Sequence, residues 1–435
     1  MAKITIINSG FCANKGDAGI LYGAITSLNK YFNKDTTYLI ESAWDCHGGL
    51  DMFRYINNEI NTYPPLWKNQ TTLTYNIKSL PIPNVPGLLE GVIKIPVLLE
   101  INKNKEIKYF GNFLSRYNKE LIDQMSDSDL IISCAGGSFH DREGGYAFLK
   151  LLYSLGIAVN FNVPVMIYAQ SIGPFHNAFC EKITRKVLDK LDFITVRDFY
   201  SKEYIKKMGV KTPVEVTADA AFALPNPFET EFNKDINEYM EKYNWIKDST
   251  FNIGVTTRDW NLNNCQRERY ITAMASLVKY LCNNYEDAII TFFPQTLSDI
   301  SFSRSICYYS SFYNKKCFVI EDDLHPMVLK GLYAKMNLFI GTRMHSTIFA
   351  MSMNIPTISI AYMPKSVDLM RRLNLEDFAF SIYNIDESKI IKSINRVIQE
   401  ESRIRQHLKK VMRHMHTSSL KNAEFAYKLS KREFP

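Results

Sequence analysis

Residues 338–362 read LFIGTRMHSTIFAMSMNIPTISIAY, and they indicate the fold class most directly. An apolar run of strand type opens it, and Gly341 interrupts that run. Apolar side chains then recur at helical spacing until Asn354 and Pro356 end the helix, and residues 357–360 read as a second buried strand. A strand, a tight turn, a helix and a parallel strand form the repeating unit of a doubly wound α/β sheet.

The turn of this unit carries Arg343 and His345, directly before the helix. A helix N-terminus offers free backbone N–H groups and the positive end of the helix dipole, so a guanidinium and an imidazole beside it suit an anion. Ligands of open α/β sheets bind at the carboxyl ends of strands. We therefore predict a functional site here; the alternative is that His345 is a helix cap or a packed core residue.

The composition indicates an ordinary enzyme-sized protein. The chain has 435 residues, so two domains of about 200 residues are expected. A net charge of +7 is too weak for a nucleic-acid partner but fits an anionic substrate or an anionic membrane surface. The eight cysteines show no metal-ligand spacing, which predicts reduced thiols, no metal site and a cytoplasmic location. No apolar run reaches the roughly 18 residues of a membrane-spanning helix.

The same strand, loop and helix pattern opens the chain. Residues 3–8 predict a strand, and a loop rich in small residues follows it. Asp17 is expected to cap a helix over residues 18–32. The loop is not a dinucleotide-binding fingerprint, and a carboxylate would repel a pyrophosphate. We interpret Asp17 as a group that orients or deprotonates a sugar hydroxyl, with a plain helix cap as the alternative.

Small or polar residues follow successive predicted strands between residues 129 and 219. The carboxyl ends of parallel strands meet at one edge of a sheet, so these residues are expected to line one edge. The candidates there are Gly136, Gly137, Gln170 and Arg197. For Arg197, a structural ion pair with Asp198 at a strand end is an equal alternative.

The alternation of strands and helices predicts two Rossmann-like, doubly wound α/β domains that face a cleft. The expected parts are an N-terminal domain at 1–225 with an insertion at 42–128, a linker at 226–249 with one helix at 234–243, a C-terminal domain at 250–385, and a basic amphipathic helix and tail at 386–435. Residues 85–100 are interpreted as internal packing, with a membrane-dipping surface as the alternative. The basic tail is interpreted as a solvated face, with contact to an anionic membrane as the alternative.

The two expected walls of the cleft differ in charge. One wall holds Arg258, Arg343 and His345, and the other holds Asp17, Gly136, Gly137 and Gln170. Cations and an imidazole opposite a carboxylate and small residues suit a multiply charged anionic donor and a neutral polyhydroxy acceptor.

Taken in order, these motifs resemble the polysaccharide pyruvyl transferase family. The matching stretches are NKGD at 14–17, AGG at 135–137, QSIGP at 170–174, VRD at 196–198, ADA at 218–220 and GTRMH at 341–345. Ser138 stands at the third position of the family's usual triple-glycine turn. Residues 42–128 and those beyond 385 match no pattern of the family.

The resemblance implies a GT-B-like fold, with the acceptor on the N-terminal domain and the donor, phosphoenolpyruvate, on the C-terminal domain, and no further cofactor. The family transfers the pyruvyl unit to a sugar, commonly as a ketal on a galactose or a hexosamine. Such sugars belong to capsules, exopolysaccharides or secondary cell-wall polymers, and the acceptors are often lipid-linked at the inner membrane face.

Roles for individual residues follow from this chemistry. Arg343 and Arg258 are expected to hold the anionic groups, and His345 to donate the proton or to stabilise the departing phosphate. Asp17 is expected to orient the acceptor hydroxyl. The further substrate-binding residues expected are Asn14, Gly16, Gly136, Gly137, Gln170, Arg197 and Ser346.

Two other functions remain open. The first is a nucleotide-sugar-dependent GT-B glycosyltransferase, against which we note that no carboxylate is placed to hold a ribose at a late strand end of the second domain. The second is a non-catalytic scaffold for glycan assembly, against which Asp17, Arg343 and His345 argue. The sequence does not specify the acceptor sugar or the oligomeric state.

Overall fold

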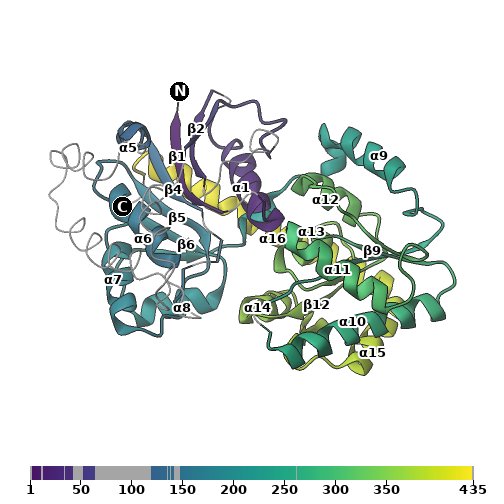
Figure 1. Ribbon diagram of the computed structural model, residues 1–435. Coiled ribbons are helices and arrows are strands. Elements are labelled where there is room, and N and C mark those ends of the chain that lie inside the picture. The colour runs from purple at the N-terminus through teal and green to yellow at the C-terminus, as the bar shows by residue number, and fades with distance from the viewer. Residues whose placement is uncertain are drawn as a thin grey trace, which may run out of the picture. The chain divides into compact units, whose positions relative to one another are not determined.

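The computed structural model describes residues 2–10, 13–33, 35–42, 52–63, 119–134, 136–137, 139–141, 147–260 and 262–433. The chain forms two compact units (Figure 1). Unit 1 consists of Met1–Cys12, Ile20–Ala223 and Ser418–Pro435, and unit 2 consists of Ala13–Gly19 and Leu224–Thr417. The boundary therefore falls inside two helices, α1 (Lys15–Leu28) and α16 (Glu401–Ser430).

Unit 1 is built on a parallel sheet of seven strands within the described residues, in the order β3-β2-β1-β4-β5-β6-β7. The strands are β1 (Lys3–Ser9), β2 (Thr37–Ser42), β3 (Ile60–Tyr63), β4 (Leu130–Ser133), β5 (Val165–Gln170), β6 (Phe193–Val196) and β7 (Val214–Val216). Besides the end of α1, the helices are α5 (Lys119–Ser126), α6 (Ala147–Ala158), α7 (Ala178–Leu188) and α8 (Phe199–Lys207).

Unit 2 repeats this plan with six strands in the order β10-β9-β8-β11-β12-β13, again all parallel. The strands are β8 (Phe251–Thr256), β9 (Ala288–Phe292), β10 (Cys317–Val319), β11 (Leu338–Gly341), β12 (Thr357–Ala361) and β13 (Ala379–Ser381). The helices are α9 (Phe232–Lys242), α10 (Asn264–Asn284), α11 (Leu297–Tyr309), α12 (Pro326–Tyr333), α13 (Met344–Ser352), α14 (Pro364–Arg372) and α15 (Glu387–Gln399).

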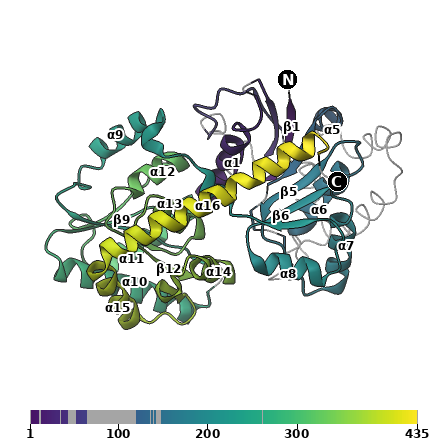
Figure 2. The ribbon, with the colours of Figure 1, turned by 180° about the vertical axis from the view of Figure 1, so that it is seen from behind.

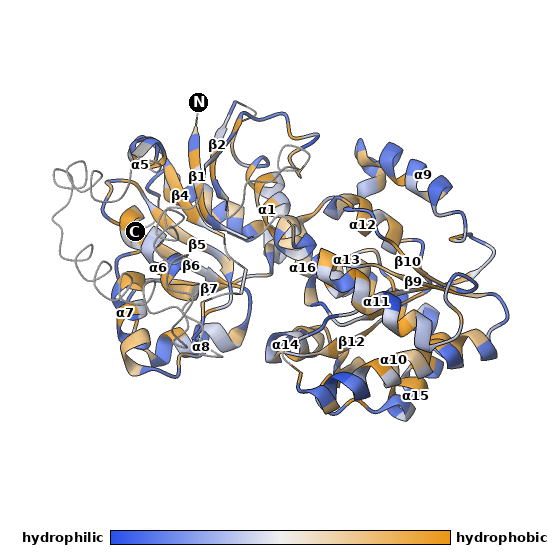
Figure 3. Ribbon diagram, in the orientation of Figure 1, coloured by the Kyte–Doolittle hydropathy of each residue, from blue (hydrophilic) through white to orange (hydrophobic). Residues whose placement is uncertain are grey.

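The central strands are apolar on both faces, as parallel strands covered by helices must be. Every residue of β4, β5 and β6 is buried. Figure 3 shows these strands and those of unit 2 as mainly hydrophobic, with polar residues on the outer helices. For this reason the strands stand out in the sequence as apolar runs, as at 130–133, 193–196 and 251–256, which form β4, β6 and β8.

The strand order reverses beside the first strand of each sheet, between β1 and β4 and between β8 and β11. Such a reversal opens a crevice at the carboxyl ends of the two strands, where ligands of this fold class bind. In unit 2 the last residue of β11, Gly341, is paired with the last residue of β8, Thr256. The turns carrying Arg258 and Arg343 therefore leave the sheet side by side.

One expected part of the N-terminal domain, the insertion at 42–128, differs in the structure. Within the expected insertion at 42–128, β3 is an edge strand of the sheet and α5 directly precedes β4. The sequence INTY of β3 is only partly buried, so it lacks the apolar run that marks the other strands. Residues 85–100, interpreted as internal packing with a membrane-dipping surface as the alternative, lie outside the described residues.

The expected linker at 226–249 belongs to unit 2. It contains the predicted helix, as α9, whose Phe232 ring stacks on the His325 ring with centroids 4.3 Å apart. Its composition is polar, but Phe232 and Ile236 on its inner face are fully buried. A few buried side chains on a charged helix are enough to dock it, and composition alone does not show them.

The C-terminal region also differs from expectation. In place of the one basic amphipathic helix expected within 386–435, the structure has α15 followed by α16, which runs on to Ser430 (Figure 2). Glu400 separates them with φ −102° and ψ 16°, and its carboxylate pairs with Arg396 and Arg403. No glycine or proline marks this break. None of the helices in the described part combines the length and apolar composition that crossing a bilayer requires.

Candidate functional site

Arg343 lies at the start of α13 and is a buried cation of unit 2. Its Nη2 donates to Asp299 Oδ1 at 2.7 Å and to Thr296 Oγ1 at 3.1 Å. The residue is 8 % exposed, and its Nε is buried with no hydrogen-bond partner among the described residues. A guanidinium held at one end, with a donor left over, is suited to an anionic ligand.

Arg258 lies in the adjacent turn, half-buried between two aromatic rings. The centre of its guanidinium is 4.1 Å from the Trp260 ring centroid and 4.6 Å from the Tyr362 centroid. Its Nη1 also donates to the Tyr362 hydroxyl. The rings restrict where the guanidinium can point, and cation–π contact stabilises its charge.

The two arginines are close enough to interact electrostatically. Burial lowers the pKa of Arg258, and the positive charge of Arg343 lowers it further. The carboxylates of Asp299 and Asp17 act in the opposite direction. Arginine stays protonated in proteins, so the two like charges persist and an anion bound beside both would relieve their repulsion.

His345 is the second residue of α13 and is half-buried. The backbone at Gly16 packs closely against the His345 side chain, so a Cβ atom at this position would overlap the imidazole ring. The first turn of α1 thus lies directly against His345, at a position where even a methyl group would displace the imidazole.

Asn14, and not Asp17, caps α1. Asn14 Oδ1 accepts from the Gly16 N–H at 3.1 Å, and its backbone oxygen accepts from Ala18 N–H at 3.0 Å. Asp17 is the third residue of the helix, and its Oδ2 accepts from Asn14 Nδ2 at 2.9 Å. The predicted helix start was therefore three residues late. Residues 13–19 belong to unit 2, so Asp17 lies in the same unit as the arginines and His345.

Ser346 is fully buried and holds the turn together. Its hydroxyl donates to the Arg343 backbone oxygen at 2.6 Å, and the Thr256 hydroxyl at 2.7 Å must then donate to it. Ser346 thereby ties the end of β8 to the turn that carries Arg343. In this arrangement it supports the site and does not present its hydroxyl to a ligand.

Gln170 lies in unit 1, in a buried polar cluster at the carboxyl ends of β1, β4 and β5. Gln170 Nε2 and Asn8 Nδ2 each lie 3.0 Å from Ser133 Oγ. The amide oxygens, Gln170 Oε1 and Asn8 Oδ1, are buried and have no hydrogen-bond partner among the described residues. Two unused acceptors at this sheet edge are suited to hydroxyl donors.

The backbone of this edge is irregular in the same places. The register shifts in β1 before Ser9 and in β5 before Gln170, and non-glycine residues there have positive φ: 59° at Asn8 and 51° at Ala169. Bulges of this kind re-aim side chains and concentrate near functional sites. Gly136, with φ 66°, accepts from the Ser171 N–H at 2.9 Å, and Gly137 follows it.

Arg197 is a buried structural residue of unit 1. Its guanidinium forms an ion pair with Asp219, and both side chains are 4 % exposed. Its Nε also donates to Ser171 Oγ at 2.8 Å. The ion-pair interpretation therefore holds with a different partner, because Asp198 instead caps α8 through the Ser201 N–H at 2.7 Å.

Several residues of the unit 2 site were not predicted, chiefly Gln295, Thr296, Asp299 and Tyr362. The signal for the first three was present in the sequence. They follow an apolar run of strand type at 288–293, and TLSD at 296–299 is an N-terminal helix pattern. Tyr362 carried no such signal. Among the described residues, no group of three or more His, Cys, Asp or Glu side chains could hold a metal ion.

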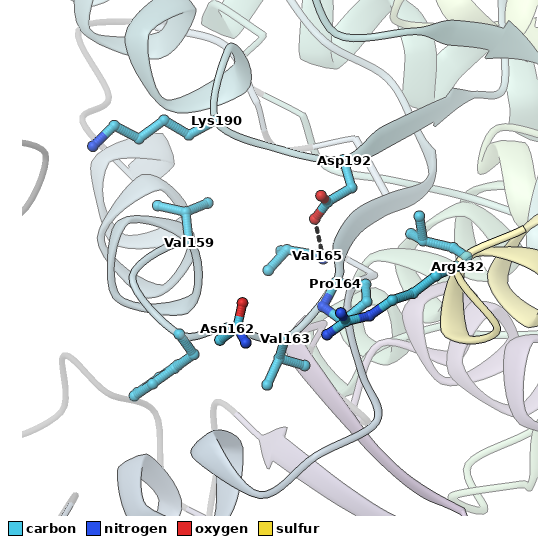
Figure 4. Close-up of a pocket in the computed structure, with 10 residues that line it drawn as sticks. Val159, Asn162, Val163, Pro164, Val165, Lys190, Asp192 and Arg432 are labelled. Atoms are coloured by element: carbon cyan, nitrogen blue, oxygen red, sulfur yellow. Dashed lines mark hydrogen bonds between the residues drawn. The ribbon is translucent and has the colours of Figure 1, made fainter. Parts of the chain in front are cut away.

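A cavity of about 280 Å³ lies elsewhere, at the amino ends of β5 and β6 in unit 1. Figure 4 shows the Asp192 carboxylate directed at the Val165 backbone N–H, which donates a hydrogen bond to it at 2.7 Å. Arg432 also lines this cavity. This is the sheet edge opposite Gln170. The cavity contains none of the predicted site residues.

Comparisons with known proteins agree with the motifs. Residues 14–363 match the family model described as polysaccharide pyruvyl transferase. The chain is 23% identical over 433 residues to the amylovoran biosynthesis protein AmsJ of Erwinia amylovora, covering 93% of this chain and 94% of that one.

Solved structures of similar fold include nucleotide-sugar enzymes. A UDP-GlcNAc 2-epimerase from Neisseria meningitidis aligns with a TM-score of 0.61 at 15% identity, covering 98% of this chain and 99% of that one. OtsA in its apo form aligns with a TM-score of 0.57 at 10% identity over 100% of both chains. At these identities the likeness shows the fold, two Rossmann-like domains of the GT-B type.

Proposed function

Because the chain belongs to the polysaccharide pyruvyl transferase family, we propose that it transfers the pyruvyl unit of phosphoenolpyruvate to a sugar hydroxyl. Family membership and the likeness to AmsJ already identify it as a transferase of polysaccharide biosynthesis. The observation that carries the finer proposal is the pair of neighbouring arginines in unit 2, one of them with a buried, unused donor.

The donor has two anionic groups, a carboxylate and a phosphate, and the site has two guanidiniums. Arg343 Nε supplies a charge-assisted hydrogen bond to one group, and Arg258, held by Trp260 and Tyr362, binds the other. The backbone N–H groups at the start of α13 add to the binding of the phosphate.

The reaction needs a proton and a nucleophile. His345, in the first turn of α13, protonates the methylene carbon of the enol, which leaves an oxocarbenium-like centre at the adjacent carbon. A sugar hydroxyl attacks that centre and gives its proton to Asp17. The bond between that carbon and the bridging phosphate oxygen then breaks. A second hydroxyl of the same sugar forms the second C–O bond and passes its proton to the departing phosphate, which completes the ketal.

The acceptor is proposed to be a galactose or a hexosamine, carried on a lipid-linked oligosaccharide. We propose that the unused amide oxygen of Gln170 accepts a hydrogen bond from one of its hydroxyls. The loop at Gly136 and Gly137 is proposed to approach the other hydroxyls. A cytoplasmic location at the inner face of the membrane belongs to the same proposal. The exposed basic residues of α16 support it: Arg403, Lys409, Lys410 and Arg413.

The test is to incubate the purified protein with phosphoenolpyruvate and a pool of glycans and to search by mass spectrometry for a gain of pyruvate minus water. We expect this product together with free phosphate, and a loss of about 10²–10⁴-fold in rate for His345→Ala. Turnover of a nucleotide sugar in place of phosphoenolpyruvate would support a glycosyltransferase, and no turnover of either donor would support a scaffold.

A further inference from the structure

Asp299, in the first turn of α11, uses its two carboxylate oxygens for different purposes. Oδ1 accepts from Arg343 Nη2 at 2.7 Å. Oδ2 accepts from the backbone N–H groups of Gln295 at 3.0 Å and Thr296 at 3.1 Å. Asp299 is 2 % exposed, so these bonds are shielded from water. One buried carboxylate thus fixes both a site arginine and the loop that follows β9.

That loop in turn holds the start of α1. The Gln295 backbone oxygen accepts from the Lys15 N–H at 3.1 Å, and Gln295 Nε2 donates to the Tyr333 hydroxyl at 2.8 Å. Lys15 is followed by Gly16, whose backbone lies against His345. A chain of contacts therefore runs from Arg343 through Asp299 and Gln295 to the segment that carries Asp17.

We infer that Asp299 is a positioning residue: it acts through Arg343 and Gln295 to align the anion-binding guanidinium with the first turn of α1. This inference rests on the proposed function. With Asp299 and Thr296 binding Nη2, the guanidinium cannot rotate freely, and its Nε is held in one direction. Fixed geometry of this kind is what a two-group anion such as phosphoenolpyruvate needs.

The substitution Asp299→Asn distinguishes a positioning role of Asp299 from a role in balancing the arginine charges. Replacing Asp299 by the isosteric asparagine removes a negative charge from beside two arginines, so the site becomes more attractive to any anion. It also removes the fixed acceptor of Arg343, because an asparagine whose oxygen faces the two backbone N–H groups turns its own NH₂ toward the guanidinium. Loss of alignment and gain of positive charge therefore act in opposite directions.

The experiment is a double-mutant cycle measured by calorimetric titration on the full chain. The four proteins are wild type, Asp299→Asn, Arg343→Lys and the double variant, each titrated with phosphoenolpyruvate and with inorganic phosphate. We expect Asp299→Asn to weaken phosphoenolpyruvate binding about tenfold, within the usual range of coupling between contacting residues. Phosphate binding should change by less than this, and the tenfold loss should disappear in the Arg343→Lys background.

The matched control is Asp386→Asn, which alters a carboxylate that caps α15 through the Lys389 N–H and should leave both affinities unchanged. If Asp299→Asn loses its fold by circular dichroism, Thr296→Val removes the other acceptor of Arg343 Nη2 and should give a smaller loss of the same kind. An equal loss in both arginine backgrounds, or no loss, would overturn the inference alone. Failure of the wild type to bind phosphoenolpyruvate would overturn the proposed function as well.

Discussion

The contact between Gly16 and His345 makes a strong prediction at the scale of single residues. A methyl group at Gly16 would overlap the imidazole and displace it. The backbone of α1 itself accepts alanine at this second helical position, because alanine is a good helix former. Gly16→Ala should therefore keep the fold and lower the rate of pyruvyl transfer by about 10²-fold, as small misplacements of catalytic groups do.

A double variant gives the control for this prediction. Since the alanine acts by displacing His345, adding Gly16→Ala to His345→Ala should cost little further activity. If Gly16→Ala lowers the activity as much in the His345→Ala background as in the wild type, Gly16 acts on some other part of the site. Circular dichroism and thermal melting of each variant would show that the fold is kept.

Lys330 of α12 predicts a pH dependence of stability. It is buried, donates to the backbone oxygens of Leu224 at 2.7 Å and Pro225 at 3.0 Å, and burial lowers its pKa to about 7. The unfolded chain, with the ordinary pKa of 10.5, binds more protons between pH 7 and pH 10.5. The contribution of Lys330 to stability is therefore least favourable below pH 7 and improves as the pH rises through this window.

The measurement compares wild type with Lys330→Met by urea unfolding at several pH values. Above pH 7, the unfolding free energy of the wild type should rise relative to that of the variant by roughly 1 kcal/mol per pH unit, since one pKa unit corresponds to about 1.4 kcal/mol. The hydrogen bonds lost in the variant add a contribution to this difference that does not vary with pH. A difference that does not vary with pH would contradict the lowered pKa.

At the scale of elements, the end of α16 is joined to unit 1 by buried hydrogen bonds. Asn422 Nδ2 donates to the Ala218 oxygen at 3.1 Å, and its Oδ1 accepts from the Thr217 hydroxyl at 2.7 Å. Asn422→Ala would remove both hydrogen bonds from this buried position, so we expect a loss of about 1–3 kcal/mol in unfolding free energy.

The neighbouring Lys421 provides the matched control, because it lies on the same helical turn and is exposed. Lys421→Ala should change the unfolding free energy by less than about 0.5 kcal/mol. Equal effects of the two substitutions in urea unfolding would mean that this end of α16 contributes little to unit 1.

How much of the fold could be predicted depended on the type of signal at each element. Strands such as β4 and β8 are buried on both faces and are therefore recognisable in the sequence as apolar runs. The edge strand β3 lacks such a run, and α14, with Pro364 at its first position, was not foreseen. No glycine or proline marks the break at Glu400 in advance.

The site was predictable where one stretch of sequence carries both the turn and the functional group, as at Arg343 and His345. It was not predictable where function depends on a partner from a distant stretch. Asp299 binds Arg343 across 44 residues, and Tyr362 binds Arg258 across 104. Such pairs form only when the sheet brings strand ends together, which a single sequence does not reveal.

At the scale of the whole molecule, ligand binding should appear as a shift in thermal stability. A donor that binds only the folded protein stabilises it by about 2.7 kcal/mol at a hundred times its dissociation constant. Phosphoenolpyruvate should raise the melting temperature of the wild type and leave Arg343→Ala unchanged. UDP-GlcNAc is the comparison ligand, and a shift with it but not with phosphoenolpyruvate would favour the glycosyltransferase.

The dual membership of α16 has a practical consequence for anyone who wants the first unit in isolation. A fragment ending at Ala223 would lack the final stretch, 418–435, that bonds to Thr217, Ala218 and Asp219. A soluble version would have to be a fusion that appends this last segment through a short artificial linker. By the same reasoning, chimaeras that exchange halves with a relative should carry the C-terminal turns along with the N-terminal half.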